Sequence, residues 1–155
     1  NNLLYRLIIM KIEVFSEKET KDIAYNLAKN AKIGDIYCLC GDLGVGKTQF
    51  SKGFSKGLLI DEDITSPTFT IVNEYDTGRI PFYHFDVYRI NDIEELYDIG
   101  YEEYFFGKGV CLIEWAEIIK DIIPKSATWI KISKNLEKGE DYRIIEVTNN
   151  EHISY

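Results

Sequence analysis

The residues with the clearest chemical pattern form a phosphate-binding loop. They fit the pattern G-x-x-x-x-G-K-[ST] and read Gly41-Asp42-Leu43-Gly44-Val45-Gly46-Lys47-Thr48. Glycines at this spacing let successive backbone N–H groups turn toward one anion. The lysine brings a positive charge to the terminal phosphates, and the threonine hydroxyl is a ligand for Mg²⁺. The pattern predicts a nucleoside triphosphate site, and Gln49 is included among its contacts.

The segments on either side of the loop have the character that such a loop needs. Residues 35–40 form an apolar run that is typical of a buried strand. After the loop, Phe50 and Phe54 are four residues apart, as on the buried face of a helix. The N-terminus of that helix adds a partial positive charge directed at the same phosphates.

Two acidic residues follow apolar segments that are expected to be strands. Asp86 follows residues 82–85, and Glu114 follows residues 110–113. A carboxylate at the carboxyl end of a strand beside a phosphate loop can coordinate Mg²⁺ or orient water. For both acids, the alternative is a charge at a strand end that only reaches solvent. His84, on the same strand face as Asp86, is either a partner of the site or a structural histidine.

A loop rich in hydroxyl groups lies between the phosphate loop and the strand that is expected to end at Asp86. It contains Ser66, Pro67, Thr68 and Phe69. Such a loop can become ordered around a γ-phosphate and relax after hydrolysis, although similar turns are common without that role. The chain has no Asn-Lys-x-Asp run and no Asp-x-x-Gly run, which guanine recognition would need. We therefore expect ATP rather than GTP.

The composition limits the partners and the compartment. With 26 acidic and 18 basic residues, the chain has a formal charge of −8 and no cluster of cations, which disfavours direct, independent binding to a polynucleotide. Cys38, Cys40 and Cys111 lie in apolar runs without zinc-site spacing, which indicates free thiols in a reducing compartment. No apolar stretch is long enough to span a membrane. We expect a cytoplasmic protein.

The order of elements predicts an α/β fold. Strands are expected at about 11–15, 35–40, 70–76, 80–88, 110–114, 128–133 and 142–147, and helices at about 17–31, 48–58, 91–106 and 115–121. We predict one P-loop NTPase-like domain over 11–155, with a mixed, mostly parallel central sheet, flanking helices and an antiparallel C-terminal edge. Because the only methionine is Met10, residues 1–10 are expected to be an N-terminal extension, from a miscalled start or a cloning remnant.

Several motifs in a fixed order resemble one protein family. After the phosphate loop come Ser66-Pro67-Thr68-Phe69 with Glu74-Tyr75, His84-Phe85-Asp86-Val87-Tyr88-Arg89, Glu95-Leu96 with Gly100, and Ile113-Glu114-Trp115. Over roughly residues 11–147 the chain resembles TsaE, the bacterial P-loop ATPase family of tRNA threonylcarbamoyladenosine biosynthesis. The resemblance implies an Mg²⁺-dependent ATP hydrolase that acts with TsaD and TsaB. Its activity would allow multiple turnovers in the modification of adenosine 37 of ANN-decoding tRNA, while TsaD would perform the transfer.

The resemblance also implies roles for the residues that could do chemistry. Lys47 would be the phosphate lysine, Thr48 and Glu114 would be magnesium ligands, and Asp86 would be an essential acid. Lys47, Asp86 and Glu114 together would form the catalytic set. Ser66 to Phe69 would be the switch-like loop.

Three further residues are less firmly placed by the resemblance. Adenine contacts are expected near Ser16 and Thr20, at the start of the first helix. Trp115 is a candidate to pack over the site or against a partner. The chain departs from the family at Ala116, where proline is usual.

Two other functions are compatible with the same residues. A small-molecule kinase would use the same loop and acids, but no arginine-rich lid is visible. A nucleotide-dependent scaffold whose hydrolysis is incidental would also use them. For a hydrolase, Arg89 is a candidate arginine finger in cis, and a partner could supply one in trans. We then expect slow hydrolysis by the isolated chain and stimulation by TsaD and TsaB.

Overall fold

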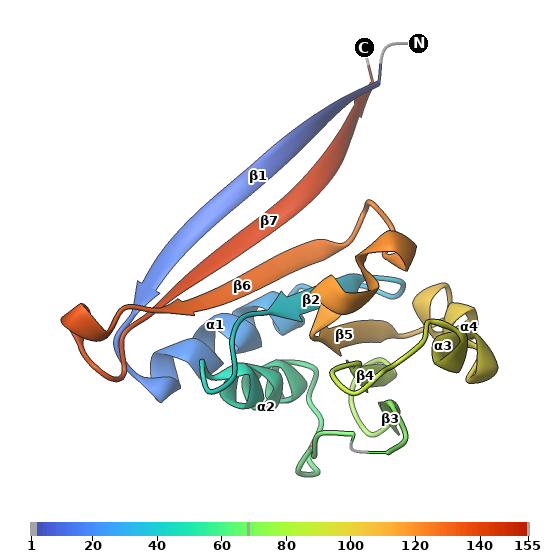
Figure 1. The fold of residues 1–155 in the computed structure, drawn as a ribbon, viewed down its shortest axis with the longest axis horizontal. Coiled ribbons are helices and arrows are strands. Elements are labelled where there is room, and N and C mark those ends of the chain that lie inside the picture. Colours follow the sequence, from blue (N-terminus) through green and yellow to red (C-terminus); the bar gives the residue numbers. More distant parts are fainter. Residues whose placement is uncertain (1–2, 68, 155) are drawn as a thin grey trace.

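The computed structural model describes residues 3–67 and 69–154 (Figure 1). Its strands are β1 (Leu3–Val14), β2 (Ile36–Cys40), β3 (Val72–Tyr75), β4 (Phe82–Asp86), β5 (Val110–Glu114), β6 (Thr128–Lys134) and β7 (Arg143–Ser154). Its helices are α1 (Glu17–Lys29), α2 (Lys47–Gly57), α3 (Glu94–Asp98), α4 (Tyr101–Phe105) and the 3₁₀ helices η1 (Ala116–Ile122) and η2 (Leu136–Lys138). In this part of the chain, no helix has both the length and the apolar character needed to cross a bilayer.

The strands form one sheet in the order β1-β7-β6-β2-β5-β4-β3. The four central strands, β6-β2-β5-β4, are parallel to one another, whereas β7 and β1 at one end and β3 at the other pair antiparallel. This arrangement confirms the predicted α/β fold with its antiparallel C-terminal edge. Figure 1 shows β1 and β7 projecting together beyond the other strands, and their pairing reaches from Val14 and Arg143 to Leu3 and Ser154.

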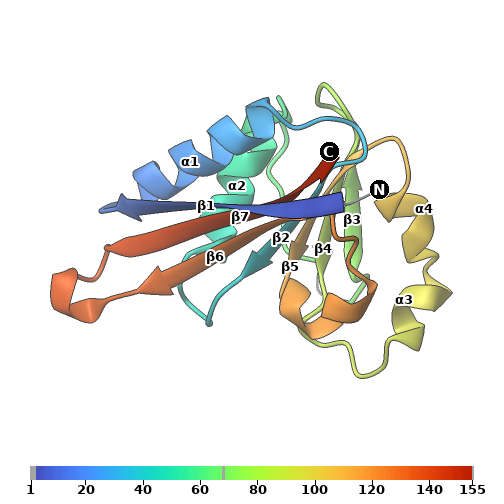
Figure 2. The same cartoon turned by 90° about the horizontal axis from the view of Figure 1, so that it is seen from above.

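The helices cover the sheet on both faces (Figure 2). On one face, Phe50 and Phe54 of α2 pack with strand residues such as Leu112, together with the alanines of α1. On the other face, α3, α4 and η1 pack over a second cluster that includes Cys111 and Ile113. Strand β5 contributes to both clusters and is buried along its whole length, as its continuous apolar run predicts.

Four expected elements differ from the structure. The single helix expected at 91–106 is two short helices, α3 and α4, because Gly100 lies between them with φ of 69°. The helix expected near 115–121 is the 3₁₀ helix η1. The first strand does not begin near residue 11 and the last does not end near residue 147, because their mutual pairing extends β1 back to Leu3 and β7 on to Ser154. The division of the chain into an extension at 1–10 and a domain at 11–155 stays a prediction.

The three cysteines are free thiols, as predicted. Cys38 and Cys111 are buried, and Cys40 is partly buried. Burial raises the pKa of the Cys40 thiol to about 11 and that of Cys111 to about 12. These thiols are therefore protonated near neutral pH and behave as small core side chains.

Two glycines of α2 allow its backbone to lie against that of α1. A Cβ atom on Gly53 would lie 2.4 Å from the carbonyl oxygen of Lys21, and one on Gly57 would lie 2.4 Å from that of Tyr25. The two glycines are four residues apart in α2, and the residues that they contact are four residues apart in α1, in the same order along the chain. The two helices therefore run in the same direction. Their N-termini therefore lie at the same end of the sheet.

We predict that Gly53→Ala lowers the free energy of unfolding by about 1–3 kcal/mol, because the added methyl group would overlap the α1 backbone. This loss would occur although alanine favours a helix over glycine by about 1 kcal/mol. Urea denaturation followed by circular dichroism measures the change. Lys52→Ala, an exposed position of the same helix, should stay within about 0.5 kcal/mol of the unsubstituted protein. An unchanged or increased stability of Gly53→Ala would contradict the close contact.

Candidate active site

The candidate site lies where three neighbouring parallel strands end. Strand β2 leads into the phosphate loop, β5 ends at Glu114 and β4 ends at Asp86. In the register of the sheet, Asp86 and Glu114 are direct partners. Because parallel strands present their carboxyl ends at one edge, the loop and both acids meet there.

The phosphate loop has the backbone conformation that its glycines predict. The φ angles of Gly41, Gly44 and Gly46 are 141°, 76° and 106°, all in the region that favours glycine. Gly46 is also the N-cap of α2, which begins at Lys47. The free N–H groups of the first helical turn and the hydroxyl of Thr48 are therefore adjacent to the loop.

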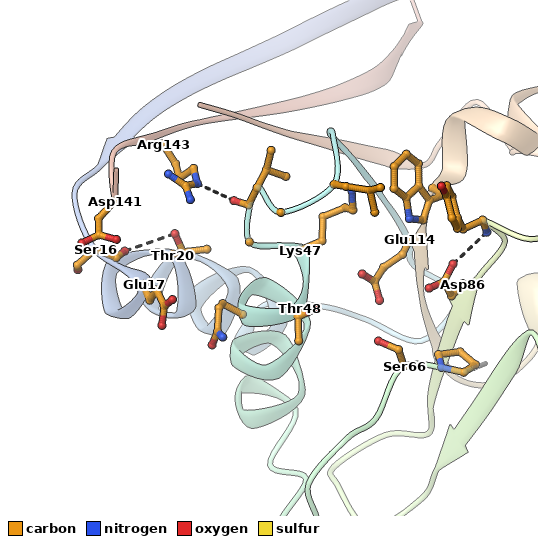
Figure 3. Close-up of a pocket in the computed structure, with 18 of the residues that line it drawn as sticks. Ser16, Glu17, Thr20, Lys47, Thr48, Ser66, Asp86, Glu114, Asp141 and Arg143 are labelled. Atoms are coloured by element: carbon orange, nitrogen blue, oxygen red, sulfur yellow. Dashed lines mark hydrogen bonds between the residues drawn. The ribbon is translucent and has the colours of Figure 1, made fainter. Parts of the chain in front are cut away.

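Most residues predicted for the site line one cleft with a volume of about 520 Å³ (Figure 3). Those on its walls are Ser16, Thr20, Leu43, Gly44, Val45, Gly46, Lys47, Thr48, Gln49, Ser66, Pro67, Asp86, Glu114 and Trp115. Gly41 and Asp42 belong to the loop but do not line the cleft, and the side chain of Phe69 is 90% exposed outside it. Thr68 lies outside the described residues. The cleft volume falls in the range of small-molecule and cofactor sites.

The cleft has two chemically different ends. Figure 3 shows Thr48, Ser66, Asp86 and Glu114 at one end, beside Lys47. The other end holds a second group, which consists of Ser16, Glu17, Thr20, Asp141 and Arg143.

Sequence reasoning did not find every residue of the cleft. It missed Glu17, Tyr88, Asp141 and Arg143, and it considered Arg89 only as an arginine finger. Glu17 directly follows the N-cap Ser16, so the cap gave a usable signal. Asp141 lies between η2 and β7, and Arg143 is the first residue of β7. No local pattern connects this part of the chain with the phosphate loop.

The ammonium group of Lys47 is held by the loop itself. Its Nζ donates hydrogen bonds to the carbonyl oxygens of Gly41 and, at 3.0 Å, Asp42. It also lies 3.7 Å from the centroid of the Trp115 ring, a cation–π contact. Burial lowers the pKa of Lys47, and the nearby carboxylates, Glu114 foremost, oppose that shift. Phosphate oxygens would offer this ammonium charged acceptors, which form stronger hydrogen bonds than carbonyls.

Trp115 packs over the site. Its backbone has φ of 62°, an uncommon conformation for a bulky residue and one that occurs at functional sites. Its ring lies between the Lys47 ammonium and the Tyr88 ring, whose centroid is 4.6 Å away. Of the two alternatives for Trp115, the structure supports packing at the site, while contact with a partner stays a prediction.

The two acids have different surroundings. Asp86 is half-buried, and its Oδ1 accepts a hydrogen bond from the backbone N–H of Tyr88 at 3.0 Å. Burial raises the pKa of Asp86, and the charge of Glu114 acts in the same direction. Glu114 is only 4% exposed, and its Oε2 lies 2.7 Å from Nε2 of His84. The structure thus makes His84 a partner of Glu114 rather than of Asp86.

Arg143 connects strand β7 with the phosphate loop. Its Nε donates a hydrogen bond to the carbonyl oxygen of Val45 at 2.7 Å. Its Nη1 donates to the carbonyl oxygens of Glu140 and Tyr142, at 2.6 and 2.7 Å. These bonds hold the guanidinium group in place, so it supports the loop from the side opposite Glu114.

The oxygen ligands at the cleft fit Mg²⁺ better than a transition metal. Within residues 3–67 and 69–154, no three His, Cys, Asp or Glu side chains converge on a metal site. The hydroxyl of Thr48 and the carboxylate of Glu114 nevertheless lie on the same cleft. Mg²⁺ is usually held by one or two protein oxygens, with phosphate and water oxygens as the other ligands.

Comparisons with known proteins agree on one family. A family model described as "Threonylcarbamoyl adenosine biosynthesis protein TsaE" matches residues 14–144. The Bacillus subtilis tRNA threonylcarbamoyladenosine biosynthesis protein TsaE is 48% identical over 139 residues, which cover 90% of this chain and 85% of that protein. The Rickettsia bellii protein of the same name is 40% identical over 135 residues, or 86% of this chain and 91% of that protein.

A solved structure extends the similarity to three dimensions. The crystal structure of Bacillus subtilis YdiB has a TM-score of 0.75 and 42% identity to this chain, and the match covers 93% of this chain and 87% of that one. The matched residues 14–144 include the phosphate loop, Asp86 and Glu114. From the extent of these matches, we conclude that the chain belongs to the TsaE family of threonylcarbamoyl adenosine biosynthesis proteins.

Proposed function

We propose that this protein is an Mg²⁺-dependent ATP hydrolase of tRNA threonylcarbamoyladenosine biosynthesis. The main support is the convergence of the phosphate loop, Glu114 and Asp86 at the ends of three adjacent parallel strands. In this proposal the protein acts with TsaD and TsaB, and hydrolysis allows them to modify adenosine 37 of ANN-decoding tRNA repeatedly. It works in the cytoplasm and meets tRNA only through these partners, in keeping with its net charge of −8.

The proposed mechanism depends on positioning and charge. The backbone of the phosphate loop and the N-terminus of α2 would bind the phosphates, and Lys47 would neutralise the terminal ones. Thr48 and Glu114 would hold Mg²⁺, which supplies further neutralisation of phosphate charge. Asp86, directly opposite Glu114, would complete the acidic wall next to the γ-phosphate. The protein forms no covalent intermediate in this scheme.

The nucleoside would lie toward the other end of the cleft. With the phosphates at Lys47, the ribose and base extend toward the N-terminus of α1, where Ser16 and Thr20 lie. The carboxylates of Glu17 and Asp141 at this end can accept hydrogen bonds from ribose hydroxyls or an amino group of the base. In the proposed ATP complex, the amino group of adenine would be one such donor.

A small-molecule kinase is less well supported than a hydrolase. Among the described residues, the cations on the cleft walls are Lys47, Arg89 and Arg143, and they come from three separate segments rather than from one lid. A nucleotide-dependent scaffold would use the same contacts as a hydrolase. The experiments below separate these functions.

The first test is ATP hydrolysis by the purified chain with and without cognate TsaD and TsaB. We expect slow turnover by the chain alone and an increase of at least about 10-fold with both partners. Of the two arginines that line the cleft among the described residues, Arg143 is bound to backbone carbonyls, which leaves only Arg89 as a candidate finger in cis. Released phosphate measures the rate, and Glu114→Gln should lose hydrolysis both with and without the partners, because it removes a proposed Mg²⁺ ligand. An absence of stimulation, together with phosphorylation of a metabolite, would favour the kinase. Normal tRNA modification by Glu114→Gln would favour the scaffold.

The second test separates phosphate binding from magnesium binding. We expect Lys47→Ala to weaken ADP binding at least about 10-fold, because it removes the cation nearest the phosphates. Glu114→Gln should bind ADP without Mg²⁺ within about 3-fold of the unsubstituted protein but lose Mg²⁺-dependent hydrolysis. Isothermal titration calorimetry measures both affinities. Equal losses of ADP binding in the two variants would argue against these separate roles.

The third test concerns the support of the loop by Arg143. We expect Arg143→Ala to weaken ADP binding about 10-fold, since the carbonyl of Val45 loses a charge-assisted hydrogen bond and the loop is less well ordered. Calorimetry gives the affinity, and thermal melting shows whether the variant is folded. Lys32→Ala, which removes an exposed charge, should leave the affinity unchanged. An Arg143→Ala variant with normal affinity would show that the loop is ordered without this bond.

A further inference from the structure

His84 and Glu114 form a buried pair behind the cleft. In the register of the sheet, His84 pairs with Leu112, two residues before the Asp86–Glu114 pair, so His84 lies on the same face as that pair. Diagonal neighbours of this kind are within reach of long side chains. Nε2 of His84 lies 2.7 Å from Oε2 of Glu114, and the two residues are 1% and 4% exposed. Solvent therefore competes little for this hydrogen bond.

The chemistry of the pair assigns the proton of this hydrogen bond. As a ligand of Mg²⁺, Glu114 would be ionised and could only accept, so Nε2 of His84 would carry the hydrogen and donate it. The other ring nitrogen, Nδ1, is buried and has no hydrogen-bond partner among the described residues. The polar interaction of the imidazole is thus directed entirely at Glu114.

Packing holds the imidazole ring in this orientation. The ring stacks on Phe82, with centroids 5.8 Å apart and an interplanar angle of 11°. Phe82 is fully buried against α2 and the sheet, so the stack is part of the core. His84 does not line the cleft, whereas Glu114 does. The direct contact of His84 with a residue of the cleft is therefore its hydrogen bond to Glu114.

We propose that His84 is a positioning residue that fixes the carboxylate of Glu114 for Mg²⁺ and the reacting phosphate. The inference rests on the proposed function. The hydrogen bond occupies Oε2, whereas Oε1 accepts no hydrogen bond from the described residues and is free for Mg²⁺ or its water. Asp86 lies directly opposite Glu114, and the two carboxylates repel each other. Without the hydrogen bond from His84, the carboxylate of Glu114 could rotate away under this repulsion.

The matched variants His84→Gln and His84→Asn test this role. The amide nitrogen of glutamine can take the place of Nε2, whereas the amide of asparagine is one methylene too short to reach Glu114. His84→Phe keeps the ring and removes the donor. With cognate TsaD and TsaB, we expect kcat to fall about 10–100-fold in the Asn and Phe variants, with KM within about 3-fold, and to recover mostly in the Gln variant.

A second readout uses the isolated chain and ADP alone. We expect Mg²⁺ to tighten ADP binding in the unsubstituted protein and in His84→Gln, but much less in His84→Asn and His84→Phe. ADP affinity without Mg²⁺ should be similar in all four proteins, and thermal melting identifies any variant that fails to fold. If His84→Phe does not fold, the Gln and Asn pair decides the question.

The outcomes separate the inference from the proposed function. Full activity and full Mg²⁺ effect in His84→Asn, or equal losses in the Gln and Asn variants, would overturn the positioning role. If the unsubstituted protein does not hydrolyse ATP with its partners, the proposed function fails. The Mg²⁺ effect on ADP affinity would then still test whether His84 orients Glu114.

Discussion

The direct contact between the backbones of α1 and α2 is the constraint on which the site depends. Gly53 and Gly57 have no side chains, so α2 can run alongside α1 in the same direction. Both helices therefore present their N-termini to the same cleft, and the partial positive charges of the two ends add there. The aromatic residues of α2 pack on the sheet at the same time, which fixes the phosphate loop relative to the strands. A side chain at either glycine would separate the helices and move one wall of the cleft.

The cleft holds charges that the fold alone does not need. Glu114 ends a strand that is buried on both faces, and Asp86 lies opposite it with the same charge. Placing two carboxylates together in a partly dry site is unfavourable unless cations or hydrogen-bond donors compensate. Lys47 and His84 provide part of that compensation. A cluster that costs stability in this way is expected at a functional site, where a metal ion and phosphates would complete the balance.

Much of the local structure follows from short-range patterns. The glycine spacing of the loop requires backbone conformations that few other residues adopt, and Gly41, Gly44 and Gly46 have them. The apolar run of β5 predicts a strand that is covered on both faces, which the structure confirms. The prediction of one continuous helix at 91–106 was wrong. The apolar pattern continues through Gly100, but the backbone there adopts a left-handed conformation that separates α3 from α4. The length of β1 was also missed, since it depends on pairing with β7, which lies at the far end of the chain.

The sequence by itself determined the phosphate loop, the α/β class and the two acids at strand ends, because each depends on residues close together in the chain. Only the tertiary structure decided which residues share the cleft. Arg143 supports the loop from a part of the chain that is distant in sequence. The hydrogen-bond partner of His84 is Glu114 on the neighbouring strand, and not Asp86 on the same strand as His84. These contacts depend on the order and register of strands in the sheet. Strand order and register are set by the packing of the whole domain, which no local spacing of residues specifies.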